Sequence, residues 1–474
     1  MPNQEPKKRS NKSPIVLAVC IVVLAVGAGL AVWAQNRSAG PDTAGNPAVP
    51  EDDSASYIVT EVPSGAPESV APEGPAAVET AAPLPEEMRG MWISYLEWLK
   101  NDISTEEKLR EVVQRMFGEC RDMGLNTVIV QVRPFSDAFY PSEYFPWSHH
   151  LTDEQGEDPG YDPLAVMVEE AHAHGLRFEA WVNPYRIDLD GGDLGPGELS
   201  DDNPAVLHPE WVREVEESGV WYDPGIPEVQ QLIVDGVREI AEKYDVDGIH
   251  IDDYFYPAFT AEQIEDGEDV AFDEDTYAQY GEGQDLAAWR RENVNTLVRS
   301  CYDAIKQVDP EISFGISPQG NNDNNYNQQY SDVKLWMETP GYVDYVMPQL
   351  YWGFNYRLQN GSDRYAFGNI TAEWAGYPRH ESVRLYAGLG AYRIEEGDGG
   401  DNDQAEWESG HNLADMAEHL RGVDGFTGFA LFRYEVLYGR DASDLAEDEI
   451  AALTEMLGGP PAAQSTPQSS SDTT

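Results

Sequence analysis

The sequence predicts an α/β protein, a closed (β/α)8 TIM barrel, from two observations. Eight strand-like runs alternate with helical patterns between residues 86 and 458, and no Pro/Ser-rich break divides this block. Strict alternation of strand and helix implies that the strands are parallel, and eight repeats imply that they close into a barrel. An open doubly wound sheet is the alternative, but no glycine-rich GxGxxG turn follows the first strand.

The barrel strands are expected at runs rich in β-branched and aromatic residues. These runs are 88–95, 126–134, 176–186, 246–257, 311–320, 344–352, 384–394 and 426–437. Helical periodicity is clear at 106–123, 162–174, 227–243, 285–307, 405–421 and 443–457, and weaker at 328–337 and 365–376. Long connections follow the strands at 135–161, 187–226, 258–284 and 321–328. Because the carboxyl end of a TIM barrel carries its active site, we expect these loops to form substrate walls.

An apolar run at residues 14–34 has the length needed for a membrane-spanning helix. The basic segment 1–13 precedes it, which places the N-terminus in the cytoplasm and the rest of the chain outside the cell. We therefore expect a single-pass signal-anchor in the cell membrane, with the barrel extracellular. If Val32-Trp33-Ala34 serves as a signal-peptidase site, the protein is secreted instead.

Residues 35–85 are rich in Pro, Ala and acidic residues, and 459–474 have a similar polar character. Such segments bury too little apolar surface to offset their ordering entropy, so a disordered linker and a disordered tail are expected. The formal net charge of -56 argues against nucleic acid as a partner, because polyanions repel each other. Cys120 and Cys301 lie on apolar helical faces, which predicts core positions rather than a disulfide or zinc site.

The run 245–257 is the clearest candidate for a catalytic strand end. Two isoleucines alternate with His250 and Asp252, so the isoleucines are expected to face the helices and the polar pair the barrel interior. A second carboxylate, Asp253, and an aromatic cluster follow at once. Asp252 and Asp253 are therefore the predicted catalytic residues, and the alternative is a solvated acidic turn after an ordinary strand.

Strand alternation also predicts which side chains line the mouth, meaning the carboxyl end of the barrel. The set is polar, hydrogen-bonding and aromatic, as in sugar sites, where ring faces stack on the sugar and polar groups bind its hydroxyls. The predicted substrate-binding residues are Trp92, Gln131, Arg133, Glu179, Trp181, Asn183, Tyr185, His250, Tyr254, Ser317, Gln349, Tyr351 and Trp352. For His250, two roles beside Asp252 are equally open: a structural hydrogen bond to this carboxylate, or a supporting position that tunes it.

Glycoside hydrolysis commonly requires two carboxyl groups, one protonated as acid and one ionised as nucleophile or base. Neighbours along a strand point to opposite faces, so Asp253 joins Asp252 only if the strand ends between them. Otherwise the second carboxylate comes from elsewhere. The sequence leaves four options open for it: Glu179, Glu435, Asp137 and Glu97.

Ordered segments spread along the chain carry a family resemblance. They include Arg-Gly-Met-Trp at 89–92, Gln-Val-Arg-Pro at 131–134, Asn-Pro-Tyr-Arg at 183–186, the run 247–257 and Met-Pro-Gln-Leu-Tyr-Trp at 347–352. Together they resemble the glycosyl hydrolase-like 10 family, also called the YngK-like family, over roughly residues 86 to 440. The resemblance implies an exported or surface-tethered TIM-barrel glycosidase, and characterised relatives include hydrolases of peptidoglycan strands stripped of stem peptides. It places the family's strand-four carboxylates on Asp252 and Asp253.

The same run loosely resembles the chitinase pattern DGxDxDxE, but His250 replaces the middle Asp and Tyr254 the acidic Glu, which counts against substrate-assisted chitinase chemistry. The leading hypothesis is a glycoside hydrolase that acts on a cell-wall glycan. Two other classes stay open: a catalytically inactive glycan-binding barrel, and a metal-dependent polysaccharide deacetylase using His250, Asp252 and Asp253. No spaced His/Asp ligand set supports the deacetylase, and neither a metal nor a cofactor is expected.

Overall fold

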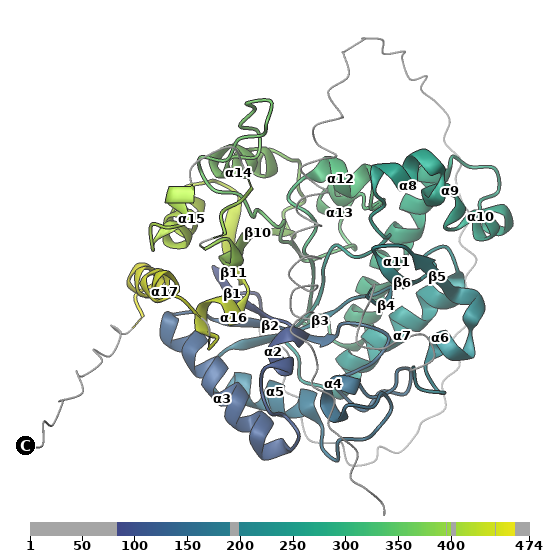
Figure 1. Cartoon of the computed structure of the whole chain (residues 1–474), viewed down its shortest axis with the longest axis horizontal. Helices are drawn as coiled ribbons and strands as arrows, with labels where there is room; N and C mark the ends of the chain where they lie inside the picture. The colour runs from purple at the N-terminus through teal and green to yellow at the C-terminus, as the bar shows by residue number, and fades with distance from the viewer. Residues whose placement is uncertain (1–82, 190–198, 395, 400–403, 441, 460–474) are drawn as a thin grey trace, which may run out of the picture. The chain divides into compact units, whose positions relative to one another are not determined.

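The computed structural model of the protein describes residues 83–189, 199–394, 396–399, 404–440 and 442–459. Its barrel strands are β1 (Met88–Ile93), β2 (Thr127–Arg133), β3 (Arg177–Val182), β7 (Gly248–Ile251), β8 (Ser313–Ile316), β9 (Tyr345–Val346), β10 (Arg384–Gly390) and β11 (Phe426–Phe432). They close in the order β1-β11-β10-β9-β8-β7-β3-β2, and every neighbouring pair is parallel. Each predicted strand run contains one of them, which confirms the closed parallel barrel (Figure 1).

The helices that alternate with the barrel strands cover the outside of the barrel. They are α3 (Glu106–Met123), α5 (Pro163–Ala173), α7 (Pro227–Lys243), α11 (Leu286–Val308), α13 (Val333–Glu338), α14 (Phe367–Ala375), α15 (Asn412–Arg421) and α17 (Asp444–Leu457). All eight predicted helices are found, but the one expected at 405–421 begins late, at Asn412. Gly410 has a φ of 71°, a left-handed conformation that a right-handed helix cannot include.

Local signals in the sequence set the ends of these helices. Thr105 caps α3, since its side chain accepts a hydrogen bond from the Lys108 main-chain N–H, and Gly124 ends the helix with a φ of 99°. Asp285 caps α11 in the same way by accepting from the Ala288 N–H at 3.0 Å. α3 therefore begins and ends at defined residues, and α11 begins at one.

Alternate strand residues fill the barrel interior. One buried cluster there consists of Met88, Trp92, Ile129, Trp181, Tyr345, Met347, Tyr386 and Ala430. The Tyr345 ring fits because Gly315 has no side chain: a Cβ at that position would lie 1.9 Å from the ring. Ile249 and Ile251 are 0% exposed in the separate outer core, as the alternation in the sequence predicts.

Polar groups close the amino end of the barrel, which we call the floor. The Arg177 guanidinium donates to the Asp247 main-chain oxygen at 2.9 Å and lies 3.7 Å from the Glu179 carboxylate. The Tyr345 hydroxyl and the Ser313 hydroxyl, the latter at 3.3 Å, both donate to Glu179. The floor is thus a hydrogen-bonded layer beneath the aromatic interior.

The end of the predicted linker contacts this floor. The Pro83 main-chain oxygen accepts a hydrogen bond from Arg177 at 3.0 Å, and Leu84 packs against the interior cluster. The predicted segments 1–13 and 14–34, the linker up to residue 82, and the tail from residue 460 lie outside the described residues. Within the ranges that the structure describes, no helix is both long and apolar enough to cross a membrane.

Shorter elements follow the strands at the mouth. They are α2 (Tyr95–Leu99), α4 (His149–Thr152), β4 (Arg186–Asp188), α6 (Pro204–Leu207), η1 (Pro209–Trp211), β5 (Val212–Val215), β6 (Gly219–Tyr222), α8 (Ala261–Asp266), α9 (Glu268–Ala271), α10 (Glu274–Tyr280), α12 (Asn322–Asn327), η2 (Ala391–Arg393), η3 (Gln404–Glu406) and α16 (Tyr434–Tyr438). β4, β6 and β5 form an antiparallel sheet, and α8, α9 and α10 group together on the same side (Figure 1). Arg213 of β5 fastens this sheet to α10 through Asp275 at 2.9 Å.

Candidate active site

Asp252 and Asp253 are the first two residues after β7, which ends at Ile251. The Tyr254 main-chain N–H donates to Asp252 Oδ1 at 3.3 Å, and this side-chain turn leads the chain out of the strand. Because both carboxylates follow the strand end, strand alternation does not separate them. The structure therefore places the two predicted catalytic residues together at the mouth.

Asp252 is buried, with 4% of its surface exposed. Burial raises the pKa of Asp252 well above its ordinary value, and the neighbouring Asp253 raises it further. Arg186 and the Trp181 side chain act in the opposite direction. The Asp252 carboxyl therefore keeps its proton to higher pH than an exposed aspartate does.

Asp253 has different surroundings. The side-chain amide of Gln349 donates to its Oδ1 at 2.9 Å, and that of Gln329 donates to its Oδ2 at 3.0 Å. Gln349 follows β9 and also donates to the Ser317 main-chain oxygen at 3.1 Å, while Gln329 follows α12 and is 3% exposed. Amide groups from two loops thus fix both oxygens of this carboxylate.

Arg186, the first residue of β4, supplies a positive charge beside Asp252. Its guanidinium lies over three aromatic rings, at 4.3 Å from the centre of Tyr254, 5.6 Å from Phe135 and 5.9 Å from Trp221. The side chain is 9% exposed. Within the described ranges it forms neither a hydrogen bond nor an ion pair.

Amide and aromatic side chains complete the mouth. Gln131 donates to Asn183 Oδ1 at 3.2 Å. Tyr351 stacks on Phe432 with ring centres 5.8 Å apart. Burial raises the pKa of Tyr351 well above its ordinary value, and the nearby Asp253 and Asp252 raise it further. We call the following residues the mouth cluster: Gln131, Trp181, Asn183, Arg186, Asp252, Asp253, Tyr254, Ser317, Gln329, Gln349 and Tyr351.

Arg186 and Gln329 were not among the residues proposed from the sequence. Arg186 ends the Asn-Pro-Tyr-Arg motif, so the motif was a usable signal for it. Gln329 lies in a polar run after α12, 76 residues from Asp253. No local pattern marks it.

His250 and Trp92 lie inside the barrel below the mouth, and their placement does not support the predicted contact with substrate. His250 is 0% exposed. The Trp92 indole donates to His250 Nε2 at 3.4 Å, and His250 Nδ1 lies 2.8 Å from the Tyr345 hydroxyl. Burial lowers the pKa of His250 to about 3, so the ring is neutral. Both of its nitrogens contact side chains inside the barrel, Trp92 and Tyr345.

Glu179 lies farther down, in the floor. It is 0% exposed and is opposite Gly248, the first residue of β7, whereas Asp252 follows the last residue of that strand. Burial raises the pKa of Glu179, while Arg177 and Tyr345 lower it. The predicted inward direction is correct, but Glu179 points into the wrong layer to bind substrate or to pair with Asp252.

Arg133 and Tyr185 face the helix layer rather than the mouth, contrary to the sequence-based expectation, while Trp352 packs against the loop before α14. In the pairing of β2 with β3, a register shift between Gln131 and Arg133 turns Arg133 outward, and its guanidinium lies 4.3 Å from the Phe145 ring. Tyr185 is 0% exposed in the outer core. Trp352 stacks on Tyr365 at 5.0 Å.

The other carboxylates proposed as a second catalytic group hold loops in place. Glu97 accepts from the Ser94 main-chain N–H at 2.8 Å and from Arg433. Glu435 pairs with Lys100 at 2.6 Å. Asp137 accepts from His149 at 3.2 Å and from Gln155 at 3.1 Å. These contacts leave Asp252 and Asp253 as the carboxyl pair at the mouth.

The comparison with known proteins decides the family. The model of the glycosyl hydrolase-like 10 family matches residues 87–409. The chain belongs to this family. Glycosyl hydrolase YngK of Bacillus subtilis is 40% identical over 329 residues, which are 65% of this chain and 61% of YngK. Glycosyl hydrolase DigH of Escherichia coli K12 is 32% identical over 404 residues, which are 77% of this chain and 87% of DigH.

This glycosyl hydrolase-like 10 chain spans only 61% of the length of YngK. Among solved structures, the glycoside hydrolase domain of PgaB (BpsB) from Bordetella bronchiseptica aligns with a TM-score of 0.45 and 12% identity. That alignment covers 77% of this chain and 99% of the domain. The fold assignment does not depend on it, because the closed order of parallel strands is present in the chain itself.

The side chains that could bind a metal ion in this glycosyl hydrolase-like 10 barrel do not favour the deacetylase alternative. That alternative needs His250 to join Asp252 and Asp253 at one ion. His250 instead contacts Trp92 and Tyr345 with its two nitrogens. In the described part of the chain, no three His, Cys, Asp or Glu side chains are grouped as ligands.

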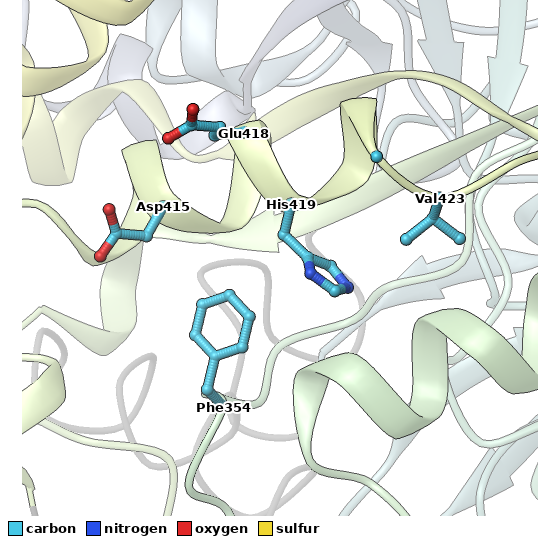
Figure 2. A pocket seen from close by; sticks show the side chains of 6 residues that line it. Phe354, Asp415, Glu418, His419 and Val423 are labelled. Atoms are coloured by element: carbon cyan, nitrogen blue, oxygen red, sulfur yellow. The ribbon is translucent and has the colours of Figure 1, made fainter.

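A pocket of about 400 Å³ lies away from the mouth, between α15 and the loop before α14 (Figure 2). Its lining residues are Phe354, Asp415, Glu418, His419, Gly422 and Val423. His419 packs edge-on against Phe354 with ring centres 5.5 Å apart, and Asp415 pairs with His411 at 2.8 Å. None of the lining residues belongs to the mouth cluster, and these contacts account for the pocket as part of helix packing.

Proposed function

We propose that the mouth cluster hydrolyses glycosidic bonds in a cell-wall glycan, and that the substrate is peptidoglycan strands lacking stem peptides. The carboxyl pair carries this proposal. Burial raises the pKa of Asp252 well above its ordinary value, while two amide groups hold Asp253 at 2.9 and 3.0 Å. Two carboxyl groups in unlike environments fit the division of work in glycoside hydrolysis.

In this mechanism the protonated Asp252 donates its proton to the glycosidic oxygen as the bond to the anomeric carbon breaks. Asp253 is the partner carboxylate, which attacks the anomeric carbon or removes a proton from the attacking water. Its two amide donors, Gln329 and Gln349, fix its direction. Trp181, Tyr254 and Tyr351 supply ring faces for the sugar, and Gln131 and Asn183 supply amide groups for its hydroxyls.

The test is an assay of the purified full chain on peptide-free peptidoglycan strands and on intact sacculi, with new reducing ends followed by mass spectrometry. We expect cleavage of the peptide-free strands by the natural protein. Asp252→Asn should lower the rate about 100- to 10,000-fold, the usual size of a general-acid contribution. Asp303→Asn, an exposed change on α11, is the matched control and should be fully active.

Binding of the strands without new reducing ends would instead support a glycan-binding barrel without turnover. Equal cleavage by the natural protein and the Asp252→Asn variant would contradict the role of Asp252. The mass of each new end identifies the bond that was cut.

We further propose that residues 14–34 anchor the protein in the cell membrane and that the linker, residues 35–85, tethers the barrel outside the cell, near the wall. The support is in the sequence: basic residues precede the apolar run, and a Pro- and Ala-rich acidic segment follows it. Protease added to intact cells should release a soluble barrel from the membrane fraction. A barrel that is protected until the cells are broken would contradict this location.

A further inference from the structure

We propose that Arg186 binds a carboxylate carried on a sugar ring, so that the mouth cluster selects an acidic glycan. This inference rests on the proposed glycosidase function and names the chemical class of its substrate. Arg186 is nine-tenths buried, lies beside Asp252 and, in the described part of the chain, forms neither a hydrogen bond nor an ion pair. A buried cation whose donors are all unused has a place for an anion.

The aromatic surroundings of Arg186 hold the cation without using its donors. Tyr254 lies 4.3 Å from the guanidinium carbon, and Phe135 and Trp221 lie within 5.9 Å of it. Aromatic rings bind a guanidinium through its flat face, so they leave its in-plane N–H groups free. That planar set of donors matches the two oxygens of a carboxylate.

A second buried arginine shows what a structural role looks like in this protein. Arg290 is 1% exposed, and its Nε donates to Asp273 at 2.9 Å and its Nη1 to the Tyr330 hydroxyl at 2.8 Å. These contacts fasten the segments after β7 and after β8 to α11, so the side chain is used in the fold. Arg186 is buried almost as deeply and lies near Asp252, but its close packing contacts are with ring faces.

Arg133 shows that stacking alone can also bury a guanidinium here. Its three nitrogens have no hydrogen-bond partner among the described residues, and its guanidinium lies 4.3 Å from the centre of the Phe145 ring. However, Arg133 is 1% exposed, and α7 closes over it: a Cβ on Gly236 would lie 2.9 Å from its Nη1. No ligand can reach it, whereas Arg186 lies at the mouth beside a catalytic carboxyl.

The negative charge of the whole chain makes a local cation necessary for binding an acidic sugar. A protein with 86 acidic and 30 basic residues repels anionic glycans, and one of these acidic residues, Asp253, lies at the mouth itself. An acidic sugar therefore needs a local cation, which Arg186 provides. In peptide-free peptidoglycan this carboxylate is the lactyl group of the muramic sugar, which becomes a neutral amide when a stem peptide is attached. A uronic acid is the other source of the same chemistry.

The test compares three substrates: peptide-free strands with free carboxylates, the same strands with the carboxylates converted to primary amides, and an oligouronide. For the natural protein we expect kcat/KM to be about 10- to 100-fold lower on the amidated strands, the usual size of a charge-assisted hydrogen bond. The Arg186→Met variant should have the same low kcat/KM on the charged strands as on the amidated strands. Arg186→Lys keeps the charge without the planar donors and should recover part of the preference.

Arg299→Met is the matched control, because Arg299 also lies over a tyrosine, Tyr342, at 4.5 Å but sits on α11. Binding of the two kinds of strand to the Asp252→Asn variant, measured by calorimetry, separates the two proposals. If this variant prefers the charged strands and the natural protein cleaves neither kind, Arg186 is supported as the anion site and hydrolysis is contradicted.

Equal binding and equal cleavage of both strands by the natural protein would overturn the inference. An Arg186→Met variant that keeps the full preference would overturn it as well. Cleavage of the oligouronide in place of the strands, with the same dependence on Arg186, would support the carboxylate site and assign it to uronic acid.

Discussion

The floor and the mouth of the barrel each hold a buried carboxyl group whose pKa is raised by burial, Glu179 and Asp252. At the floor, Glu179 receives hydrogen bonds from the Tyr345 and Ser313 hydroxyls and lies 3.7 Å from Arg177. At the mouth, Asp252 accepts a long main-chain hydrogen bond of 3.3 Å, and its neighbour Asp253 opposes its ionisation. Burial is the same at both ends, but the partners differ.

We expect this difference to separate a structural carboxyl from a reactive one. Hydrogen bonds that fully satisfy a buried carboxyl stabilise the fold and hold the group in one position. A buried carboxyl with a like charge beside it keeps a proton that it can give to a substrate. Changes at the floor should therefore lower stability, and changes at the mouth should lower activity.

The largest expected effect is at the mouth. Asp252→Asn should reduce kcat/KM about 100- to 10,000-fold, because the amide cannot donate the proton. The same change should not lower the melting temperature at neutral pH, since a neutral amide replaces a group that is costly to ionise. Activity on peptide-free strands and thermal unfolding of the same preparation measure both. A large loss of stability together with activity would place Asp252 with the structural carboxyls.

At the floor we expect a smaller effect, which lowers stability rather than activity. Tyr345→Phe removes the hydroxyl that contacts both His250 and Glu179 and should lower the free energy of unfolding by about 1–3 kcal/mol, because it leaves buried polar groups unpaired. The kcat of the folded variant should stay near that of the natural protein. Chemical denaturation and steady-state kinetics check the two halves.

Tyr185→Phe is the control for the floor variant. The Tyr185 hydroxyl is buried without a hydrogen-bond partner among the described residues, so its removal should change stability little. A loss of activity in Tyr185→Phe would restore Tyr185 to the substrate site.

The amide clamp on Asp253 should have a milder effect than either change. Gln329→Leu removes one of the two donors to this carboxylate, and we expect kcat to fall about tenfold with KM nearly unchanged. Gln329 acts through Asp253, so the split between kcat and KM distinguishes positioning from substrate binding. Gln328→Leu, a change at the neighbouring residue, is the control. An increase in KM alone would mean that Gln329 binds the sugar.

The architecture was predictable because barrel strands and helices carry their own periodicity. Each of the eight predicted strand runs contains a barrel strand, and α3 and α7 have the predicted bounds. The error at α15 came from Gly410, whose left-handed conformation interrupts an otherwise helical pattern. Local sequence signals thus account for the elements and for most of their ends.

The site was predictable only in part. Gln131, Asn183 and Gln349 lie at the mouth, as strand alternation predicts. Alternation tells which side chains point into the barrel but not how far along the barrel axis they lie, so it did not show that Glu179 lies at the floor. The register shift in β2 that turns Arg133 outward depends on pairing with β3, which no local pattern shows. Gln329 reaches Asp253 across 76 residues of sequence, and such contacts exist only in the folded chain.

The smallest expected effect is a change in how the free energy of unfolding depends on pH, caused by the titration of Asp252 at the mouth. The pKa of Asp252 is raised in the folded protein above its unfolded value of about 3.9, so the folded state binds the proton more tightly. Above that unfolded value, rising pH removes the proton more easily from the unfolded chain, and the natural protein loses stability until the folded pKa is passed. Asp252→Asn lacks this titration.

Unfolding by urea at a series of pH values should therefore show equal stability of the two proteins near pH 4 and a growing advantage for the variant above it, at most about 1.4 kcal/mol per pH unit. Activity of the natural protein should fall as pH rises through the folded pKa, because the acid form of Asp252 is lost. A stability difference that shrinks with rising pH would mean that Arg186 holds Asp252 ionised. In that case the proton donor would have to be another group at the mouth.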